Sequence, residues 1–330
     1  MSRLLSSRDE LLERGIIQAL VFYDLFGYPL TLVELSKFLQ DSEARLAGQS
    51  FRLSEILLAF RHRESLRRKV EEADGFYFLR GRKDLVAGRL NRHRLALPRW
   101  KKAVKLIRWL SGVPFLKMVA LCNMFPIETP RVDSDIDVVI VARHGRLWLV
   151  RLLVTMLIAL TGQWRHKKVA GKICLSFFIS DQNLDLQKLY QEKKIWFKKD
   201  PYLFNWAALL YPVYDREGTA AKFWAANGWV RQYLPQGYPV QSVPLRTARG
   251  RAGALTWPSF WERIWAGRAG AWLEKTVRWW QWEYMKARGD PEWLKNPNVI
   301  RSDEVLKFHE IDRREYFRQK FEERLMEAYR

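Results

Sequence analysis

The chain has 330 residues, of which 48% are hydrophobic, enough to bury a substantial core in two or three domains. Its formal net charge of +21 favours an anionic partner such as nucleic acid, a nucleotide or an acidic protein. No apolar run reaches the roughly 18 residues of a membrane span. The N-terminus also lacks the apolar core of a signal peptide. We therefore expect a cytoplasmic protein without a membrane segment.

Residues 1–83 have the pattern of a winged helix-turn-helix module. Helical periodicity runs through 11–26 and again through 54–63, and a capping box at Thr31 opens a helix between them. Asp74-Gly75 in front of an apolar run predicts a tight hairpin. Basic side chains flank the third helix and the hairpin, which favours contact with DNA. Such modules also serve as protein interfaces or packing domains, and that alternative stays open.

A basic helix is predicted over 84–110, and Ser111-Gly112-Val113-Pro114 ends it. This helix links the first module to a sheet domain over 111–200. Strands are expected at 116–121 and 172–180, on either side of a third, strongly apolar strand. The apolar run from Leu152 to Leu160 is interpreted as a buried helix that covers the sheet.

Two carboxylates stand at the start of that apolar strand, where Ser134-Asp135-Ile136-Asp137 runs into Val138 to Val141. Side chains alternate along a strand, so Asp135 and Asp137 point the same way. Aligned carboxylates repel one another unless a cation lies between them, and a divalent metal is the usual partner. A short D-x-D string also occurs at solvated strand ends and turns. The strand before it and the apolar strand and long helix after it favour the metal site.

The S-D-I-D string and the strands around it resemble the nucleotidyltransferase superfamily of the DNA polymerase beta type. Three further stretches are similar to bacterial nucleotidyltransferase-domain proteins with an N-terminal helical segment: Gly145 to Trp148, Gly171 to Cys174 and Leu306 to Glu310. The resemblance implies an α+β fold with a small mixed sheet, on which Asp135 and Asp137 bind Mg²⁺ or Mn²⁺ and act in catalysis. The implied reaction moves a nucleoside monophosphate from a nucleoside triphosphate to an acceptor.

In that family a Gly-Ser turn holds the nucleotide phosphates and a third carboxylate lies on a neighbouring strand. Here Asn123 and Met124 replace the turn, and with Ser134 and Lys172 they are the expected nucleotide-binding residues. Asparagine reaches the left-handed backbone conformation more readily than most residues, but methionine has no hydroxyl. The strand at 172–180 contains no acid. The remaining candidates for the third carboxylate are Glu128, Asp181 and Asp185.

Near the end of the sequence, His309, Arg313 and Arg314 form a dense charged cluster. The resemblance implies that this segment packs near the active face, where the arginines hold phosphate and His309 acts on a hydroxyl proton. A solvated charged helix is the alternative. The altered turn and the missing acid also leave a second function open, a catalytically degenerate regulatory protein that binds nucleic acid or a protein partner through its basic winged helix.

The C-terminal region, residues 201–330, is predicted to be helical and rich in Trp and Arg, with an exposed connection at 240–255. Trp265, Trp272 and Trp279 recur every seven residues, which predicts a packed seam, with a base-stacking platform as the alternative.

Cys122 and Cys174 lie on or beside predicted strands, without a C-x-x-C motif or a paired histidine spacing. We expect both to be reduced, buried side chains without a metal or redox role.

Overall fold

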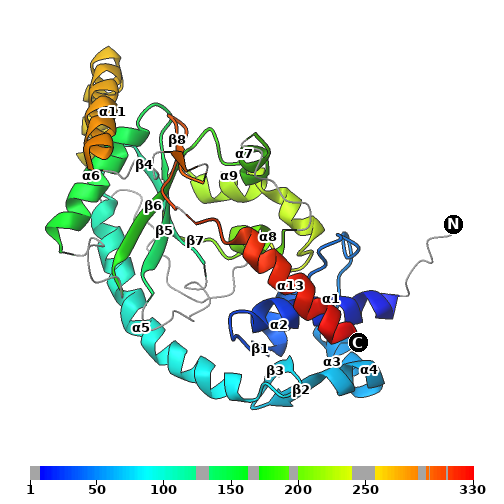
Figure 1. Ribbon diagram of the computed structural model, residues 1–330. Helices are drawn as coiled ribbons and strands as arrows, with labels where there is room; N and C mark the ends of the chain where they lie inside the picture. Colours follow the sequence, from blue (N-terminus) through cyan, green and yellow to red (C-terminus); the bar gives the residue numbers. More distant parts are fainter. Residues whose placement is uncertain are drawn as a thin grey trace.

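The computed structural model describes residues 8–123, 134–162, 171–192, 200–239, 257–288, 295–296, 298–309 and 311–330. Its centre is a six-stranded sheet in the order β7-β4-β5-β6-β9-β8. In that order the strands are Tyr211–Asp215, Leu116–Leu121, Ile136–Ala142, Ile173–Ser180, Val305–Lys307 and Ile300–Arg301. Strands β5 and β6 are parallel, and the other neighbours pair antiparallel. The fold is therefore mixed α+β, as expected (Figure 1).

Alternate residues of β5 face opposite layers of helices. Val138 and Ile140 pack on one face with side chains from α5 (Asp84–Leu110), α6 (Leu147–Leu160) and α11 (Arg268–Arg288). Val139 and Val141 face the other layer, which includes α8 (Pro201–Ala208) and α9 (Thr219–Ala226). The remaining short helices of this region are α7 (Leu186–Glu192), η2 (Gly228–Gln232) and α10 (Trp257–Ile264). No helix in the described ranges is long and apolar enough to cross a bilayer.

The predicted helix over the apolar run is confirmed as part of α6, but only one side of it is buried. Val154 and Ile158 lie in the core, whereas Met156 is 51% exposed and Leu160 is 81% exposed. The helix therefore covers the sheet with one face and leaves apolar side chains on the other.

The N-terminal module contains α1 (Arg8–Asp24), α2 (Leu32–Lys37), α3 (Leu53–His62) and α4 (Glu64–Lys69). Its three-stranded antiparallel sheet has the order β1-β3-β2, with bounds Leu30–Thr31, Phe76–Leu79 and Val70–Ala73. Thr31 and Glu34 form the expected capping box. Asp74 and Gly75 both have positive φ, 54° and 77°, which suits the tight hairpin that their sequence predicts.

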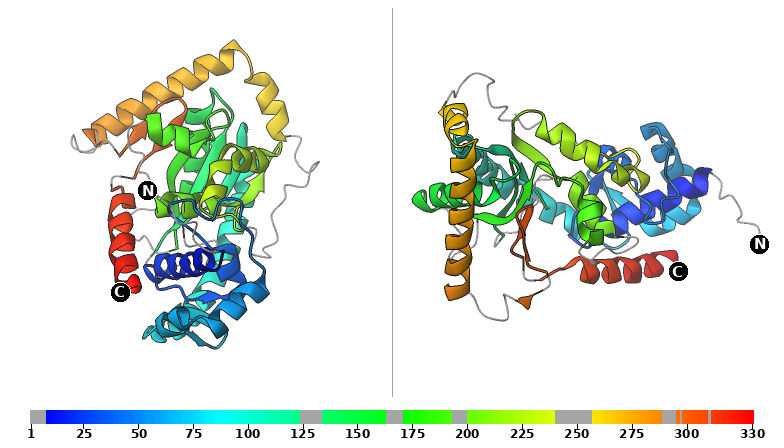
Figure 2. Two further views of the ribbon diagram at one scale, coloured as in Figure 1. Left: turned by 90° about the vertical axis from the view of Figure 1, so that its right-hand side faces the viewer. Right: turned by 90° about the horizontal axis from the view of Figure 1, so that it is seen from above.

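This module shares one continuous core with the sheet. In that core the Tyr23 hydroxyl of α1 donates to Asn205 of α8 over 3.1 Å, and the Asn205 amide donates to Gln40 over 2.6 Å. Helix α13 (Arg314–Tyr329) lies beside α1, as Figures 1 and 2 show, with the rings of Phe321 and Phe22 6.3 Å apart. Helix α5 runs from the module to the sheet along one side of the molecule (Figure 1).

The expectation that the sheet ends near residue 200 is wrong, as is a purely helical region beyond it. Strands β7, β8 and β9 all come from residues after 200, and β9 pairs with β6. Their apolar runs are only two to five residues long, and such short runs carry little periodicity of their own. The predicted exposed connection at 240–255 lies outside the described residues.

The expectation of a packed Trp seam is also wrong for two of its members. Trp272 is 68% exposed and Trp279 is 64% exposed, while Val277 and Met285 of α11 contribute to the core. Helical spacing shows that residues share a face, but it does not show which of two apolar faces turns inward. In α11 the aliphatic face packs against the core and the tryptophan face is exposed.

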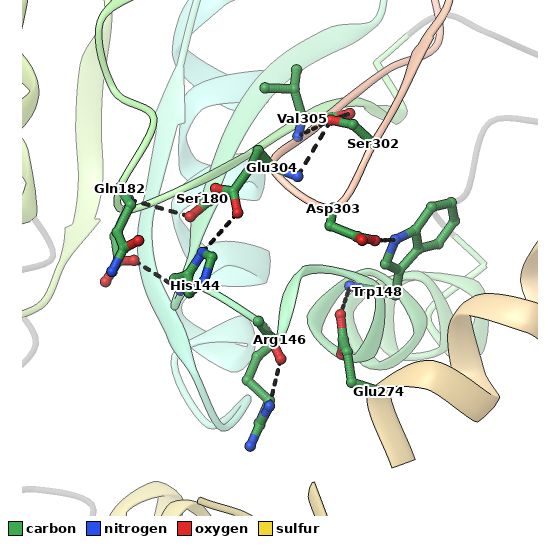
Figure 3. A network of polar contacts seen from close by, with 12 residues as sticks. His144, Arg146, Trp148, Ser180, Gln182, Glu274, Ser302, Asp303, Glu304 and Val305 are labelled. Carbon is green, nitrogen blue, oxygen red and sulfur yellow. Dashed lines mark hydrogen bonds and ion pairs between the residues drawn. The ribbon is translucent and has the colours of Figure 1, made fainter. Parts of the chain in front are cut away.

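Helix α11 is fixed to α6 by a half-buried carboxylate (Figure 3). Glu274 accepts hydrogen bonds from the backbone N–H groups of Trp148, at 2.8 Å, and Leu149, at 2.9 Å, and so caps the first turn of α6. Burial raises the pKa of Glu274 above its usual value. The Trp148 indole donates to Asp303, and Nδ1 of His144 lies 2.7 Å from Oε1 of Glu304. Both contacts attach the turn between β8 and β9 to the start of α6 and the residues just before it.

Candidate functional site

A cavity of about 510 Å³ opens on the face of the sheet that α8 covers. Asp135 and Asp137 both line it. The C-terminal segment contributes Lys307, His309 and Arg313 to its wall. The structure thus brings together charged groups that lie about 170 residues apart in the sequence.

The expected turn at Asn123 is present at the edge of the cavity. Its φ is 60°, the left-handed conformation predicted for this residue. Its side-chain amide donates to Oδ2 of Asp137 over 2.5 Å, and its oxygen accepts from the Tyr202 hydroxyl over 3.4 Å. Asn123 therefore orients the carboxylate of Asp137. Met124 and Glu128 lie outside the described residues.

Three side chains form a row across the strands that carry the site. The Cys122 backbone N–H donates to the Asp137 carbonyl over 3.2 Å, and Asp137 stands opposite Cys174 in the parallel β5-β6 pair. Residues that stand opposite one another project to the same face, so Cys122, Asp137 and Cys174 point the same way. Both cysteines are buried thiols. Burial, followed by the charge of Asp137, raises the pKa of Cys122 well above its usual value.

His309 completes a compact group beside this row. One ligand atom each from Asp137, Cys174 and His309 lies within 4.8 Å of the other two. The His309 Nε2 to Asp137 Oδ1 distance is 4.0 Å, and the His309 side chain is 43% exposed. Cys174 stands on the neighbouring strand β6, opposite Asp137.

The basic part of the wall is held by its own carboxylates. Arg314 bonds to both oxygens of Asp312, with a closest distance of 2.6 Å, and lies 3.5 Å from Asp200. Lys307 lies 3.5 Å from Asp312. Burial alone would raise the pKa of Asp312, but hydrogen bonds from Arg314 and the charge of Lys307 lower it to about 2. Burial raises the pKa of Asp200 to about 6 against the opposing charge of Arg314.

Arg313 differs from Arg314 because it is exposed where it lines the cavity.

Aromatic side chains complete the wall. Arg314 stacks over the ring of Tyr190 at 4.1 Å, and burial raises the pKa of that phenol to about 12. The cavity consequently combines acid, cation and ring surfaces, the groups needed for a ligand with phosphates and a planar base.

The other sequence-predicted residues lie elsewhere. Lys172 donates to the Gly162 carbonyl over 3.1 Å and is not part of the cavity wall. Ser134 precedes the carboxylates, with its hydroxyl 3.5 Å from Arg99. Asp181 and Asp185 follow the distant end of β6, where Asp181 accepts from the His144 backbone and Asp185 from that of Lys188. Neither can supply the third carboxylate.

The potential metal ligands in and beside the cavity are of two kinds, which suit different metal ions. Asp135 and Asp137 offer the oxygen ligands that Mg²⁺ and Mn²⁺ prefer, so they fit the expected ion. The thiol of Cys174 and the imidazole of His309 do not fit Mg²⁺. Sequence reasoning assigned Cys174 no role, although it lies on the strand on which an acid was sought.

No family model, curated protein or solved structure matches this chain.

Proposed function

We propose that the protein is a metal-dependent nucleotidyltransferase of the DNA polymerase beta-like type. The reaction would move a nucleoside monophosphate from a nucleoside triphosphate to an acceptor hydroxyl. The observation that carries the proposal is the shared cavity, which Asp135 and Asp137 line together with Lys307, Arg313 and Arg314. The parallel β5-β6 pair next to antiparallel β4 is the sheet arrangement that the proposal requires.

Asp135 and Asp137 would hold Mg²⁺ or Mn²⁺, which when bound supplies charge neutralisation for the phosphates. Asn123 keeps the Asp137 carboxylate oriented through its 2.5 Å hydrogen bond. Arg313 is the exposed cation on the wall and is assigned to a phosphate oxygen. Arg314 would contribute positive charge near the phosphates without binding them directly, because Asp312 and Asp200 already hold its guanidinium. Two buried cysteines outside any disulfide suit a reducing cytoplasm.

The test is binding of a nucleoside triphosphate with and without Mg²⁺, measured by calorimetry. The double variant Asp135→Asn with Asp137→Asn should lose the Mg²⁺-dependent part of the binding. Asp181→Asn with Asp185→Asn is the matched control, because it removes two carboxylates at the other end of β6 and should bind as the wild type does. Equal binding by wild type and the Asp135/Asp137 variant would contradict the proposal.

A second candidate function is nucleic-acid binding by the N-terminal module, which we propose to be a winged helix. It is favoured by Arg61 in α3 and Arg67 in α4, both of which are exposed. Other nearby basic residues hold the fold, because Arg63 pairs with Asp9, and Arg89 of α5 pairs with Glu34. The binding surface would therefore be smaller than the count of basic residues indicates.

For this function the measurement is duplex DNA binding over a range of salt concentrations. Arg61→Gln with Arg67→Gln should weaken binding and lower the salt slope by about two. Arg278→Gln with Lys286→Gln removes the same charge from α11 and should leave both unchanged. An equal loss of DNA affinity in the two variants would show that only the net charge of the protein matters. That result would contradict DNA binding through the proposed winged helix.

A further inference from the structure

The group formed by Asp137, Cys174 and His309 has a geometry that its sequence positions do not show. Asp137 and Cys174 are direct neighbours in the parallel β5-β6 pair, so their side chains leave the same face of the sheet. His309 follows β9, the strand on the other side of β6, and its ring lies over this pair. Three separate segments of the fold therefore converge on one point.

The spacing of the three ligand atoms is close to that of a metal centre. Tetrahedral ligands about 2.0–2.3 Å from Zn²⁺ are roughly 3.3–3.8 Å apart. In the structure the three atoms lie within 4.8 Å of one another, and the nitrogen to carboxylate distance is 4.0 Å. A contraction of about one ångström would close the group around an ion. His309 follows the end of β9 and is exposed, so its side chain has room to make that movement.

The chemistry of the donors selects the ion. Thiolate and imidazole bind Zn²⁺ and other transition metals, whereas Mg²⁺ takes oxygen ligands and retains several waters. One Asp, one Cys and one His give three protein ligands, which is the number found in zinc sites that keep an open position. Asp137 and His309 line the cavity, so the fourth position would face it.

A disulfide does not account for the cysteines in this row. Cys122 and Cys174 lie on either side of Asp137, two strand spacings apart, or about 9.5 Å between backbones. A disulfide requires Cα atoms within about 7 Å. Only Cys174 is grouped with Asp137 and His309, so the two buried cysteines have different surroundings and provide a matched pair for an experiment.

We propose that Asp137, Cys174 and His309 form a binding site for Zn²⁺ or a similar transition-metal ion, on the inner wall of the cavity. The site shares Asp137 with the proposed Mg²⁺ position and competes with it for that carboxylate. His309 then serves as a metal ligand in place of its expected role with a hydroxyl proton. This inference depends on the three side chains and does not depend on nucleotidyl transfer.

The experiment uses the full chain, freed of metal by a chelator that is then removed, and titrated with Co²⁺ as a spectroscopic substitute for Zn²⁺. The wild type should develop a thiolate-to-cobalt charge-transfer band at one equivalent. Equimolar Zn²⁺ should abolish the band, and a thousandfold excess of Mg²⁺ should leave it. Cys174→Ser should lose the band, while Cys122→Ser should retain it at full intensity.

His309→Ala is the second variant, chosen because the residue is exposed and its loss should not affect folding. It should weaken Co²⁺ binding at least tenfold with unchanged circular dichroism. A band that is absent from the wild type, persists in Cys174→Ser or disappears in Cys122→Ser would overturn the proposal. Asp135→Asn separates it from the proposed function, because this variant should lose Mg²⁺-dependent nucleotide binding and retain the cobalt band.

Discussion

The side-chain amide of Asn123 donates a 2.5 Å hydrogen bond to Oδ2 of Asp137, while the backbone of Asn123 holds a φ of 60°. The residue thus has two separable tasks, a left-handed turn and the orientation of a carboxylate. Glycine adopts this φ without strain, whereas a residue with a Cβ and no local hydrogen bond is penalised by about 1–2 kcal/mol.

Asn123→Gly should therefore keep the turn and lose the hydrogen bond, while Asn123→Ala should lose both. We expect the alanine variant to have an unfolding free energy about 1 kcal/mol below that of the glycine variant. Both should show weaker Mg²⁺-dependent nucleotide binding. Urea unfolding and calorimetry measure the two effects, and equal stability of the variants would remove the role of the backbone conformation.

Asp312 should make folding sensitive to acid. Its pKa is lowered to about 2, below the unfolded value near 3.9. A carboxyl with a depressed folded pKa contributes stability that is present above about pH 4 and is lost as pH falls toward 2. The stability difference between wild type and Asp312→Asn should shrink over that window. A constant difference from pH 5 to pH 2 would contradict the assignment.

Asp200 should have the opposite dependence. Burial raises its pKa to about 6, so the folded state binds a proton more tightly than the unfolded state does. Its contribution to stability is complete below about pH 4 and is lost as pH rises through 6. Asparagine can also cap α8, whose Leu203 N–H donates to Asp200 over 2.9 Å. Relative to wild type, Asp200→Asn should thus gain stability between pH 4 and pH 7 in urea titrations.

Phe321 should anchor α13 to the rest of the fold. It is 2% exposed and packs against Phe22 of α1. Phe321→Ala should lower the unfolding free energy by about 3–5 kcal/mol. Met326 on the same helix is 61% exposed, and Met326→Ala should change it by less than about 0.5 kcal/mol. Hydrogen exchange should show faster opening of α13 in the first variant alone.

Local patterns predicted much of the fold because local chemistry determines those elements. The capping box at Thr31, the hairpin at Asp74-Gly75 and the strand at 116–121 all depend on neighbours in the chain. Strands β8 and β9 were not predicted, because two or three residues become a strand only when a partner is present. Their pairing with β6 is a tertiary effect.

The site divides in the same way. The closeness of Asp135 and Asp137 in the sequence was sufficient to predict that they lie near each other, and both line the cavity. The side chain of Lys172 instead bonds to Gly162, and nothing in the order of residues indicates that contact. Cys174 acquires its neighbours from the register of β5 with β6 and from the path of the chain after β9. Such relationships follow from the assembled sheet and leave no periodic trace in the sequence.

The late strand β9 also sets the order in which the protein matures during synthesis. A ribosome releases Asp135 and Asp137 long before it has made Lys307, His309 and Arg313. Until β9 joins β6, the nascent chain has a sheet edge exposed to solvent and a cavity without its cationic side. Until that pairing forms, the free edge of β6 can pair with another strand.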